Sequence, residues 1–363
     1  MRLLIAGGGT GGHLFPGIAV AEAWRHRHPA AAIQFVGTRC GLEAHAVPQA
    51  GFSLAFLPVR GLRGKSPRHV LGTLGRLPQA QLEAWRLVRD FGPELALGVG
   101  GYASGPALLA AQAQRIPTVV MEQNAIAGWT NRILARLSTL VIAGMPVADL
   151  PANKTRVLGN PVREALLPVR AHPYRPQQPL RLLVLGGSQG ARALNSAVIA
   201  ALPLAEARGL RLEVVHQVGQ GDLARVRAAY QHAHAEGLQM QPQVFAFIDD
   251  IARAYQHADL VLCRAGAMTL SEVTVCGLPS LLIPLPTAAG DHQTANARAL
   301  AGVGAAVHLP QGELTGSALA GLLADFDEDR PRLMAMADRA RSQGRPQALD
   351  DIVACLEACA RHV

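Results

Sequence analysis

A histidine directly follows a run of glycines near the start of the chain, and together these residue types can bind an anion and move a proton. Residues 7–13 read Gly-Gly-Gly-Thr-Gly-Gly-His; the apolar run Leu3–Ala6 precedes them, and a helical pattern begins after Pro16. Glycines have no Cβ, so successive backbone N–H groups can converge on a phosphate at the positive end of the following helix. Imidazoles titrate near neutral pH, so His13 is a candidate general base beside that phosphate.

The same glycines also have the spacing of a dinucleotide-binding loop. Gly7, Gly9 and Gly12 form a G-x-G-x-x-G pattern, which requires an acid at the end of the second strand to bind a ribose. The second predicted strand, 33–36, ends in Gly-Thr-Arg instead, so we do not expect an NAD site. A loop that binds phosphate or pyrophosphate and a turn that is only tight remain as the two interpretations.

An isolated acid follows a strand in the second half of the chain. Residues 264–271 form a small loop after the apolar strand 260–263, and Glu272 falls on the first turns of the next helix. A carboxylate at this position can accept hydrogen bonds from both hydroxyls of a ribose. The helix dipole alone also favours an acid near a helix start, so both explanations stay open.

Strands and helices alternate along the chain, which predicts an α/β fold with doubly wound parallel sheets. After the opening strand, the predicted strands of the first half are 33–36, 52–59, 95–99, 118–121 and 141–143, the last of which completes the sheet of that half. The predicted helices include 82–91 and 107–114. Those of the second half are 181–185, 213–217, 244–247, 260–263 and 280–283. Ligands bind beyond the carboxyl ends of such strands, so His13, Ser104 and the Glu-Gln-Asn of residues 122–124 should face one cleft.

A linker rich in Pro, Gln and Arg, residues 159–179, separates two similar halves. After it, the strand 181–185 leads into Gly-Gly-Ser-Gln-Gly and a helix, which repeats the design of the amino terminus. We therefore expect an N-terminal Rossmann-like domain over 1–160, completed by a terminal helix over 343–363, and a second such domain over 164–342. Two anion loops imply a cleft between the domains that holds two phosphorylated ligands.

Composition favours an anionic partner. Half of the 363 residues are hydrophobic and only 4% are aromatic, as in the cores of buried parallel sheets. Lysine and arginine number 34 against 26 acids, a formal net charge of +8, and no groove-reading motif is present, so we expect phosphorylated molecules or acidic lipids and no nucleic acid. Five scattered cysteines predict a reducing cytoplasm, and the apolar runs are too short for a membrane span.

One segment, Arg60–Leu77, combines basic residues with leucines and contains no acid. This combination suits a surface that lies on anionic lipid headgroups. A solvated basic loop followed by an ordinary amphipathic helix explains the same pattern equally well.

Several motifs in order along nearly the whole chain resemble the MurG family of bacterial N-acetylglucosaminyltransferases. They are GGGTGGHLFPG, GVGGYASGPALLAA, EQNAIAGWTNR, GNPVR, LGGSQGARALN, FIDDIARAY, RAGAMTLSE and GDHQTANA. The resemblance implies a GT-B fold, with two Rossmann-like domains facing each other across a cleft. It also implies transfer of GlcNAc from UDP-GlcNAc to the 4-hydroxyl of MurNAc in undecaprenyl-pyrophosphoryl-MurNAc-pentapeptide (lipid I), with inversion, to give lipid II. The enzyme would act peripherally at the cytoplasmic face of the plasma membrane.

The resemblance also implies roles for individual residues. His13 would be the general base, Ile248 would meet the uracil and Glu272 the ribose. The residues implied to bind UDP-GlcNAc are Thr10, Gly11, Gly12, Asn124, Arg163, Ser188, Ile248, Ala267, Met268, Thr269, Leu270, Ser271, Glu272 and Gln293. No cofactor or metal is expected, because the dipole of the second glycine loop could stabilise the departing UDP. Residues 7–12 could instead bind the acceptor's pyrophosphate.

Two other functions are compatible with these residues. A UDP-GlcNAc 2-epimerase shares the two-domain architecture and the nucleotide sugar, but it would need no membrane contact. A nucleotide-sugar sensor would give His13 no chemical role, which makes it the weaker alternative.

Overall fold

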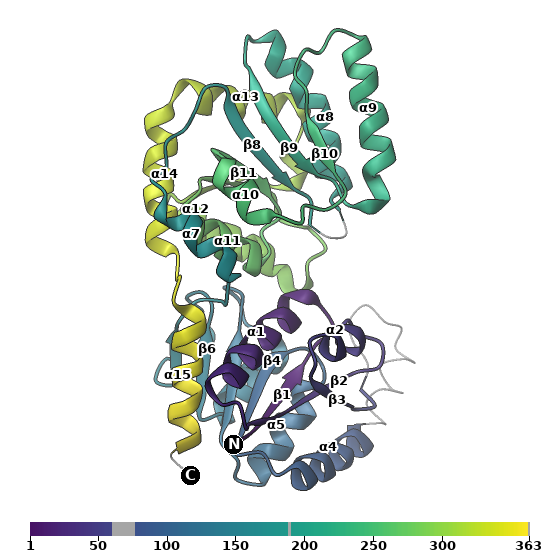
Figure 1. Ribbon diagram of the computed structural model, residues 1–363, viewed down its shortest axis with the longest axis vertical. Helices are drawn as coiled ribbons and strands as arrows, with labels where there is room; N and C mark the ends of the chain where they lie inside the picture. Colours follow the sequence, from purple (N-terminus) through teal and green to yellow (C-terminus); the bar gives the residue numbers. More distant parts are fainter. Residues whose placement is uncertain (60–76, 188–189, 362–363) are drawn as a thin grey trace. The chain divides into compact units, whose positions relative to one another are not determined.

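The structure is a computed structural model that describes residues 1–59, 77–187 and 190–361. The basic segment Arg60–Leu77 lies outside the described residues, apart from Leu77 as the first residue of a helix, and so does Ser188. The chain divides into two compact units (Figure 1). Residues Met1–Pro161 and Gln347–Val363 form the N-terminal unit, and Val162–Pro346 form the C-terminal unit.

A seven-stranded sheet of parallel strands forms the centre of the N-terminal unit, in the order β3-β2-β1-β4-β5-β6-β7. The strands are β1 (Arg2–Gly7), β2 (Ala32–Gly37), β3 (Ser53–Phe56), β4 (Leu95–Gly100), β5 (Thr118–Glu122), β6 (Leu140–Ala143) and β7 (Thr155–Val157). Strands β2 and β3 are added to one side of β1, and the strands from β4 onward are added to its other side, so the strand order reverses between β1 and β4. The carboxyl ends of these two strands therefore form the switch point at which such sheets bind ligands.

Helices cover both faces of this sheet (Figure 1). They are α1 (Gly11–Arg27), α2 (Glu43–Gln49), α4 (Leu77–Phe91), α5 (Ser104–Ala113), α6 (Trp129–Leu137) and α15 (Ala348–Arg361). Alternate residues of β1 point to opposite faces. Leu3 and Ile5 pack in one core with side chains of α1 and α15, and Leu4 packs in another with side chains of α4, α5 and α6. The helix near the carboxyl terminus thus belongs to the core of the N-terminal unit.

The C-terminal unit repeats this plan with a six-stranded parallel sheet in the order β10-β9-β8-β11-β12-β13. The strands are β8 (Leu180–Leu185), β9 (Leu212–Gln217), β10 (Gln243–Phe245), β11 (Leu260–Cys263), β12 (Ser280–Leu282) and β13 (Ala306–His308). Its switch point lies between β8 and β11. The second glycine loop follows β8, and the loop before Glu272 follows β11, so both leave the sheet at this point.

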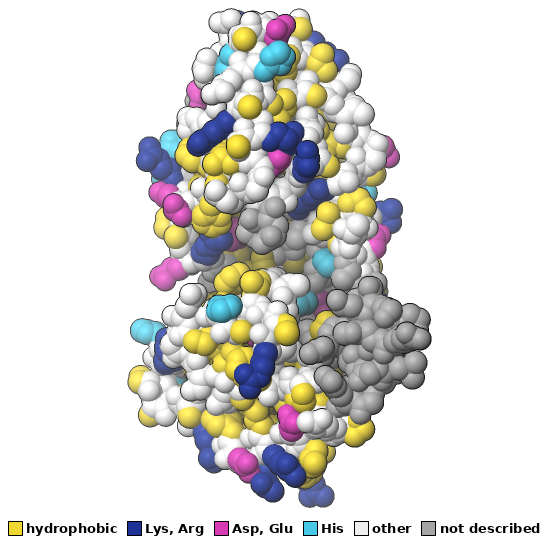
Figure 2. Space-filling model, turned by 90° about the vertical axis from the view of Figure 1, so that its right-hand side faces the viewer, with side chains coloured by type: hydrophobic (Ala, Val, Ile, Leu, Met, Phe, Trp, Pro, Cys, Tyr) yellow, Lys and Arg dark blue, Asp and Glu magenta, His cyan; other side chains and the backbone are white. Residues whose placement is uncertain are grey.

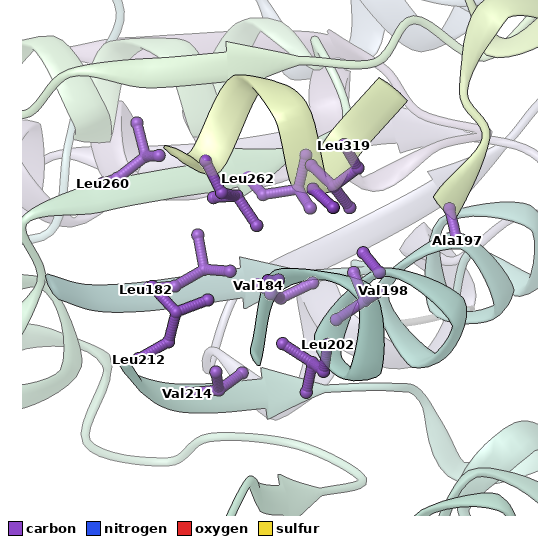
Figure 3. Packing of buried hydrophobic residues seen from close by; sticks show 14 of the residues in the cluster. Leu182, Val184, Ala197, Val198, Leu202, Leu212, Val214, Leu260, Leu262 and Leu319 are labelled. Carbon is purple, nitrogen blue, oxygen red and sulfur yellow. The ribbon is translucent and has the colours of Figure 1, made fainter. Parts of the chain in front are cut away.

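The helices of this unit connect its strands and close its core. They are α7 (Leu167–Ala171), α8 (Arg192–Ala207), α9 (Leu223–Ala235), α10 (Ile251–His257), α11 (Ala267–Cys276), α12 (His292–Gly302), α13 (Gly316–Glu328) and α14 (Arg330–Gln343), with single 3₁₀ turns at Glu164–Leu166, Gln220–Asp222, Ala289–Asp291 and Gln311–Glu313. Figure 3 shows leucines and valines of β8, β9 and β11 packed against α8 and α13. Such burial of aliphatic side chains is the main force that holds the layers together.

The sequence predicted every strand of the two sheets except two, but it named only some of the helices, and it placed the start of one helix wrongly. Strands β7 and β13 were not predicted, and each is only three residues long. Helix α1 begins at Gly11 rather than after Pro16, so the proline lies inside the helix. A proline there removes one backbone hydrogen bond, and the burial of Leu14 and Ile18 beside β1 offsets that cost.

Over the three described stretches of the chain, no helix combines the length and the hydrophobicity that are needed to cross a lipid bilayer.

Candidate active site

The glycine loop of the N-terminal unit is held at the switch point by close backbone contacts. The Gly8 N–H donates a hydrogen bond to the Gly100 carbonyl, with 3.2 Å between nitrogen and oxygen. A Cβ on Gly101, whose φ is +88°, would overlap the Gly8 carbonyl. Helix α1 begins directly after this contact, with Thr10 as its N-cap. The His13 N–H donates to the Thr10 carbonyl at 3.2 Å. The N–H groups of Gly11 and Gly12, at the start of the helix, have no partners within it, so they can bind an anion at the carboxyl end of the sheet.

A buried carboxylate holds the same loop from α2. The Glu43 side chain accepts hydrogen bonds from the N–H of Gly9 (2.7 Å) and from both the N–H and the hydroxyl of Thr38 (2.8 Å each). Glu43 is 1% exposed. A Cβ would collide with this side chain at three glycines: Gly8, Gly37 and Gly41. Glu43 therefore couples the first glycine loop to the end of β2.

His13 lies on the first turn of α1 and contacts the polar residues that follow β5. Its Nδ1 is 2.8 Å from Oε1 of Gln123. The Gln123 amide nitrogen donates in turn to the Val99 carbonyl at 3.2 Å, and the Asn160 amide nitrogen donates to the Gln123 carbonyl at 3.1 Å. The structure thus brings His13 into contact with Gln123, the middle residue of the Glu-Gln-Asn sequence.

Glu122 organises the backbone around Asn124. It is buried at the end of β5, and one of its oxygens accepts from the Asn124 N–H (3.0 Å) and from the Asn124 amide (3.1 Å). The other oxygen accepts from the Gly128 N–H (3.0 Å) and from the Asn131 amide (2.8 Å). Ser104, which the sequence placed in the same group, is buried and donates to the Gly101 carbonyl at 2.7 Å, so it supports the β4 turn.

In the C-terminal unit, the structure brings Arg163 and Glu272 together. The Arg163 Nε lies 3.3 Å from one carboxylate oxygen of Glu272, and the Tyr255 hydroxyl donates to the other at 3.1 Å. Burial raises the pKa of Glu272, and this effect exceeds the lowering by Arg163 and by the tyrosine hydrogen bond. Burial also raises the pKa of Tyr255, which keeps that hydroxyl a donor. Tyr255 was not predicted from the sequence, because it lies 17 residues before its partner Glu272.

The remaining predicted residues of this unit surround the carboxyl end of its sheet. Residues 267–271 form the start of α11, where the Ser271 hydroxyl donates to the Ala267 carbonyl at 3.0 Å. The Gln293 side-chain oxygen accepts from the Leu285 N–H at 2.9 Å. The Ile248 N–H donates to Gln217, the last residue of β9, at 3.3 Å.

A buried polar network supports the second glycine loop. His216 on β9 is bonded through Nδ1 to the Tyr230 hydroxyl (2.9 Å) and through Nε2 to the Asn195 side-chain oxygen (3.1 Å). The Asn195 amide donates to the Val218 carbonyl (3.0 Å) and to Asp222 (2.7 Å). Burial lowers the pKa of His216 to about 4, so this ring is neutral at physiological pH. The network joins α8, whose start follows the loop, to β9 and α9.

Within residues 1–59, 77–187 and 190–361, no three His, Cys, Asp or Glu side chains lie close enough together to hold an ion. The anion-binding chemistry available in these residues is that of glycine loops, helix starts and arginine.

The fold and these sites define the class of the protein. Residues 3–143 match the glycosyltransferase family 28 N-terminal domain, and residues 181–352 match the glycosyltransferase family 28 C-terminal domain. The crystal structure of MurG from Acinetobacter baumannii is similar over 98% of this chain and 99% of that chain, with a TM-score of 0.83 and 33% identity. The chain is therefore a two-domain glycosyltransferase of the GT-B fold.

Curated relatives narrow the class further. A protein of Anaeromyxobacter dehalogenans (strain 2CP-1) is 47% identical over 99% of this chain and 94% of its own length, and one of Syntrophotalea carbinolica is 44% identical over 99% of both. Both are named UDP-N-acetylglucosamine–N-acetylmuramyl-(pentapeptide) pyrophosphoryl-undecaprenol N-acetylglucosamine transferase. This chain belongs to that family, the MurG enzymes. A UDP-GlcNAc 2-epimerase from Neisseria meningitidis, 15% identical with a TM-score of 0.64, shares the fold alone.

Proposed function

We propose that this protein transfers GlcNAc from UDP-GlcNAc to the 4-hydroxyl of MurNAc in lipid I and so forms lipid II. The observation that carries the proposal is the 47% identity to a named transferase over 99% of the chain. The arrangement of the two switch points supports it, because each places a glycine loop and polar side chains at the carboxyl ends of its strands.

His13 is the proposed general base. With Nδ1 bonded to Gln123, Nε2 is the nitrogen that can take the proton from the acceptor hydroxyl. The oxygen then attacks the anomeric carbon of GlcNAc on the face opposite to UDP, and the bond from that carbon to the phosphate oxygen breaks. UDP leaves with the bonding electron pair, and the configuration at the anomeric carbon inverts.

The C-terminal unit is the proposed site of UDP. Glu272 would accept hydrogen bonds from the ribose hydroxyls, residues 267–271 would line the nucleotide, and Ile248 would meet the uracil. Arg163 is half-exposed and already lies beside Glu272, so its guanidinium is available to a phosphate of the same ligand. The start of α8, after the loop that contains Ser188, would stabilise the negative charge that develops on UDP.

In the N-terminal unit, the proposed donor contacts are Thr10, Gly11, Gly12 and Asn124. The alternative in which residues 7–12 bind the acceptor's pyrophosphate uses the same N–H groups of α1. Peripheral binding at the cytoplasmic face of the plasma membrane is part of the proposal, because the acceptor is anchored by a polyprenyl chain.

The test measures UDP release from UDP-GlcNAc with and without lipid I. We expect release to depend on lipid I and lipid II to form in equal amount. Epimerised sugar from UDP-GlcNAc alone would instead indicate the epimerase reaction. The variant His13→Ala should lower kcat by roughly 10²–10⁴ with little change in UDP-GlcNAc affinity, whereas the control His45→Ala, an exposed histidine on α2, should not. A His13→Ala enzyme of nearly normal kcat would remove His13 from the role of base.

A further inference from the structure

The direction of the Gln123 amide follows from its surroundings. Gln123 is 1% exposed, and one end of its amide lies 3.2 Å from the Val99 carbonyl while the other lies 2.8 Å from Nδ1 of His13. A carbonyl can only accept a hydrogen bond, so the amide NH₂ must face Val99. The amide oxygen must then face His13, where it can only accept.

This arrangement determines which imidazole nitrogen carries the proton. Because the Gln123 oxygen is an acceptor, Nδ1 of His13 must donate, and in the neutral ring Nε2 then holds the free electron pair. We propose that Gln123 is a positioning residue that fixes His13 as the Nδ1–H tautomer and so presents Nε2 as the base. The proposal rests on the assignment of His13 as general base made above.

The backbone around this pair is built to hold it. A Cβ on Gly100, whose φ is +99°, would lie 2.7 Å from Nδ1 of His13, so the glycine makes room for the ring. Asn160 donates to the Gln123 carbonyl at 3.1 Å, which fixes the main chain from which the amide extends. The end of β4, the end of β5 and the start of α1 therefore define the position of the imidazole together.

A neutral amide has a different effect from a carboxylate in this place. A carboxylate bonded to Nδ1 would also select the tautomer, but its charge would stabilise the protonated ring and raise the pKa of the imidazole. Gln123 orients the ring without adding that charge. The Val99 carbonyl beside it would in addition repel a carboxylate, whereas it accepts a hydrogen bond from the amide.

The experiment reads the tautomer directly. In protein labelled with ¹⁵N-histidine, the ring nitrogens of His13 are assigned by comparison with His13→Ala and followed at a pH where the ring is neutral. We expect the Nδ1–H form in the wild type and, in Gln123→Met, a shift toward the Nε2–H form that prevails for histidine in water. The control Gln112→Met removes an amide that donates to Thr118 at the opposite end of β5 (3.1 Å), and it should leave the His13 signals unchanged.

Kinetics separate positioning from a merely structural role. Gln123→Met should lower kcat by roughly 10–10²-fold, with the KM for UDP-GlcNAc nearly constant. This is less than the roughly 10⁴-fold loss caused by a neighbour that locks a catalytic imidazole in the wrong tautomer, because methionine releases the ring without locking it. In a His13→Ala background the same change should cost nothing more. An Nε2–H tautomer in the wild type, an unchanged tautomer in Gln123→Met, or a full additional loss in the double variant would overturn the proposal.

The two proposals fail in different ways. If His13→Ala keeps its kcat, the assignment of the base fails whatever the tautomer is. If His13→Ala is inactive but the wild-type ring is Nε2–H, His13 remains the base and the role of Gln123 fails.

Discussion

At the scale of single residues, Glu272 is a carboxylate that the fold buries almost completely. It is 9% exposed. In place of the water molecules that would solvate it in the unfolded chain, its carboxylate contacts the Arg163 guanidinium and the Tyr255 hydroxyl. Since burial is the largest effect and raises its pKa, the charged form is less stable in the fold than in water.

The first prediction concerns the stability of the unliganded protein. A carboxyl group with a raised folded-state pKa favours folding at pH values below its unfolded value of 4.5, and this contribution is lost as the pH rises through the folded value. Glu272→Gln, which mimics the neutral form, should therefore unfold at a higher temperature than the wild type at pH 7 and at the same temperature near pH 4. The exposed neighbour of Arg163 provides the control, since Glu164→Gln should show no such difference. A lower melting temperature for Glu272→Gln at pH 7 would mean that the contact with Arg163 outweighs burial.

The second prediction concerns UDP. A hydrogen bond to a charged group is worth roughly 1.5–3 kcal/mol, so Glu272→Gln should weaken UDP binding by about one to two orders of magnitude. The loss should be smaller for 2′-deoxy-UDP, which has already lost the contact in the wild type. Calorimetry with both proteins and both ligands completes a double-mutant cycle. Simple additivity of the two changes would show that Glu272 does not touch the 2′-hydroxyl.

At the scale of elements, the features that were predicted correctly are those determined by residues close together in the sequence. The apolar runs of β1 and β8 and the glycines after them identified both switch points, because strand, loop and helix there are contiguous. The sequence did not predict Glu43, which reaches Gly9 from 34 residues away. The spacing of Tyr255 from Glu272 is likewise set by the order of strands in the sheet and not by any local period. Strand β7 was not predicted, because its three residues pair with β6 at the edge of the sheet and therefore carry no apolar pattern that the sequence would reveal.

The third prediction tests Glu43 as the support of the first glycine loop. All three groups bonded to its carboxylate are donors, so Glu43→Gln would turn an NH₂ toward at least one of them. We expect a loss of about 2 kcal/mol in unfolding free energy, measured by chemical denaturation, together with a fall in kcat/KM. Glu22→Gln, an exposed carboxylate on α1, is the matched control and should change neither quantity. Unchanged stability in Glu43→Gln would show that the loop holds its own shape.

The fourth prediction concerns the network that joins α8, β9 and α9. A histidine whose folded pKa is depressed to about 4 contributes stability above its unfolded value of 6.5, and that contribution is lost as the pH falls through the folded value. By linkage the loss amounts to about 3 kcal/mol. The melting temperature of the wild type should therefore fall between pH 6.5 and 4, and His216→Gln should reduce this dependence. His232→Gln, at an exposed position on α9, should retain it.

At the scale of the whole molecule, the positive net charge and the lipid-anchored substrate raise the question of which surface binds the bilayer. The segment predicted to lie on anionic lipid, Arg60–Leu77, leads directly into α4. On α4 the side chains of Leu82, Trp85, Arg86 and Arg89 are exposed at helical spacings of three and four residues, so they share one face. Figure 2, in which the right-hand side of Figure 1 faces the viewer, shows Lys and Arg side chains at the lower end of the view, with acidic and hydrophobic side chains among them. Leucine and tryptophan can enter the headgroup region and arginine can pair with lipid phosphates, so we predict that Leu82, Trp85 and Arg86 extend this surface. Arg89 pairs with Asp90 instead, at 2.8 Å.

The last prediction tests that surface with the triple variant Leu82→Ser, Trp85→Ser and Arg86→Gln. Each basic residue near an anionic bilayer contributes about 1 kcal/mol and the two apolar side chains add to it, so co-sedimentation with phosphatidylglycerol vesicles should fall by about tenfold or more. The melting temperature should fall somewhat, chiefly through Trp85, because this side chain is 38% exposed whereas that of Leu82 is 50% exposed. Vesicle binding is therefore compared at a temperature at which both proteins are folded. The control Leu204→Ser and Met334→Ser removes two exposed apolar side chains from the C-terminal unit and should leave vesicle binding intact. Wild-type binding should also weaken as salt is raised or as phosphatidylcholine replaces the anionic lipid, because the attraction is screened within about one Debye length. If the triple variant binds these vesicles as the wild type does, α4 is not part of the membrane surface, and the exposed leucine and tryptophan are ordinary surface residues.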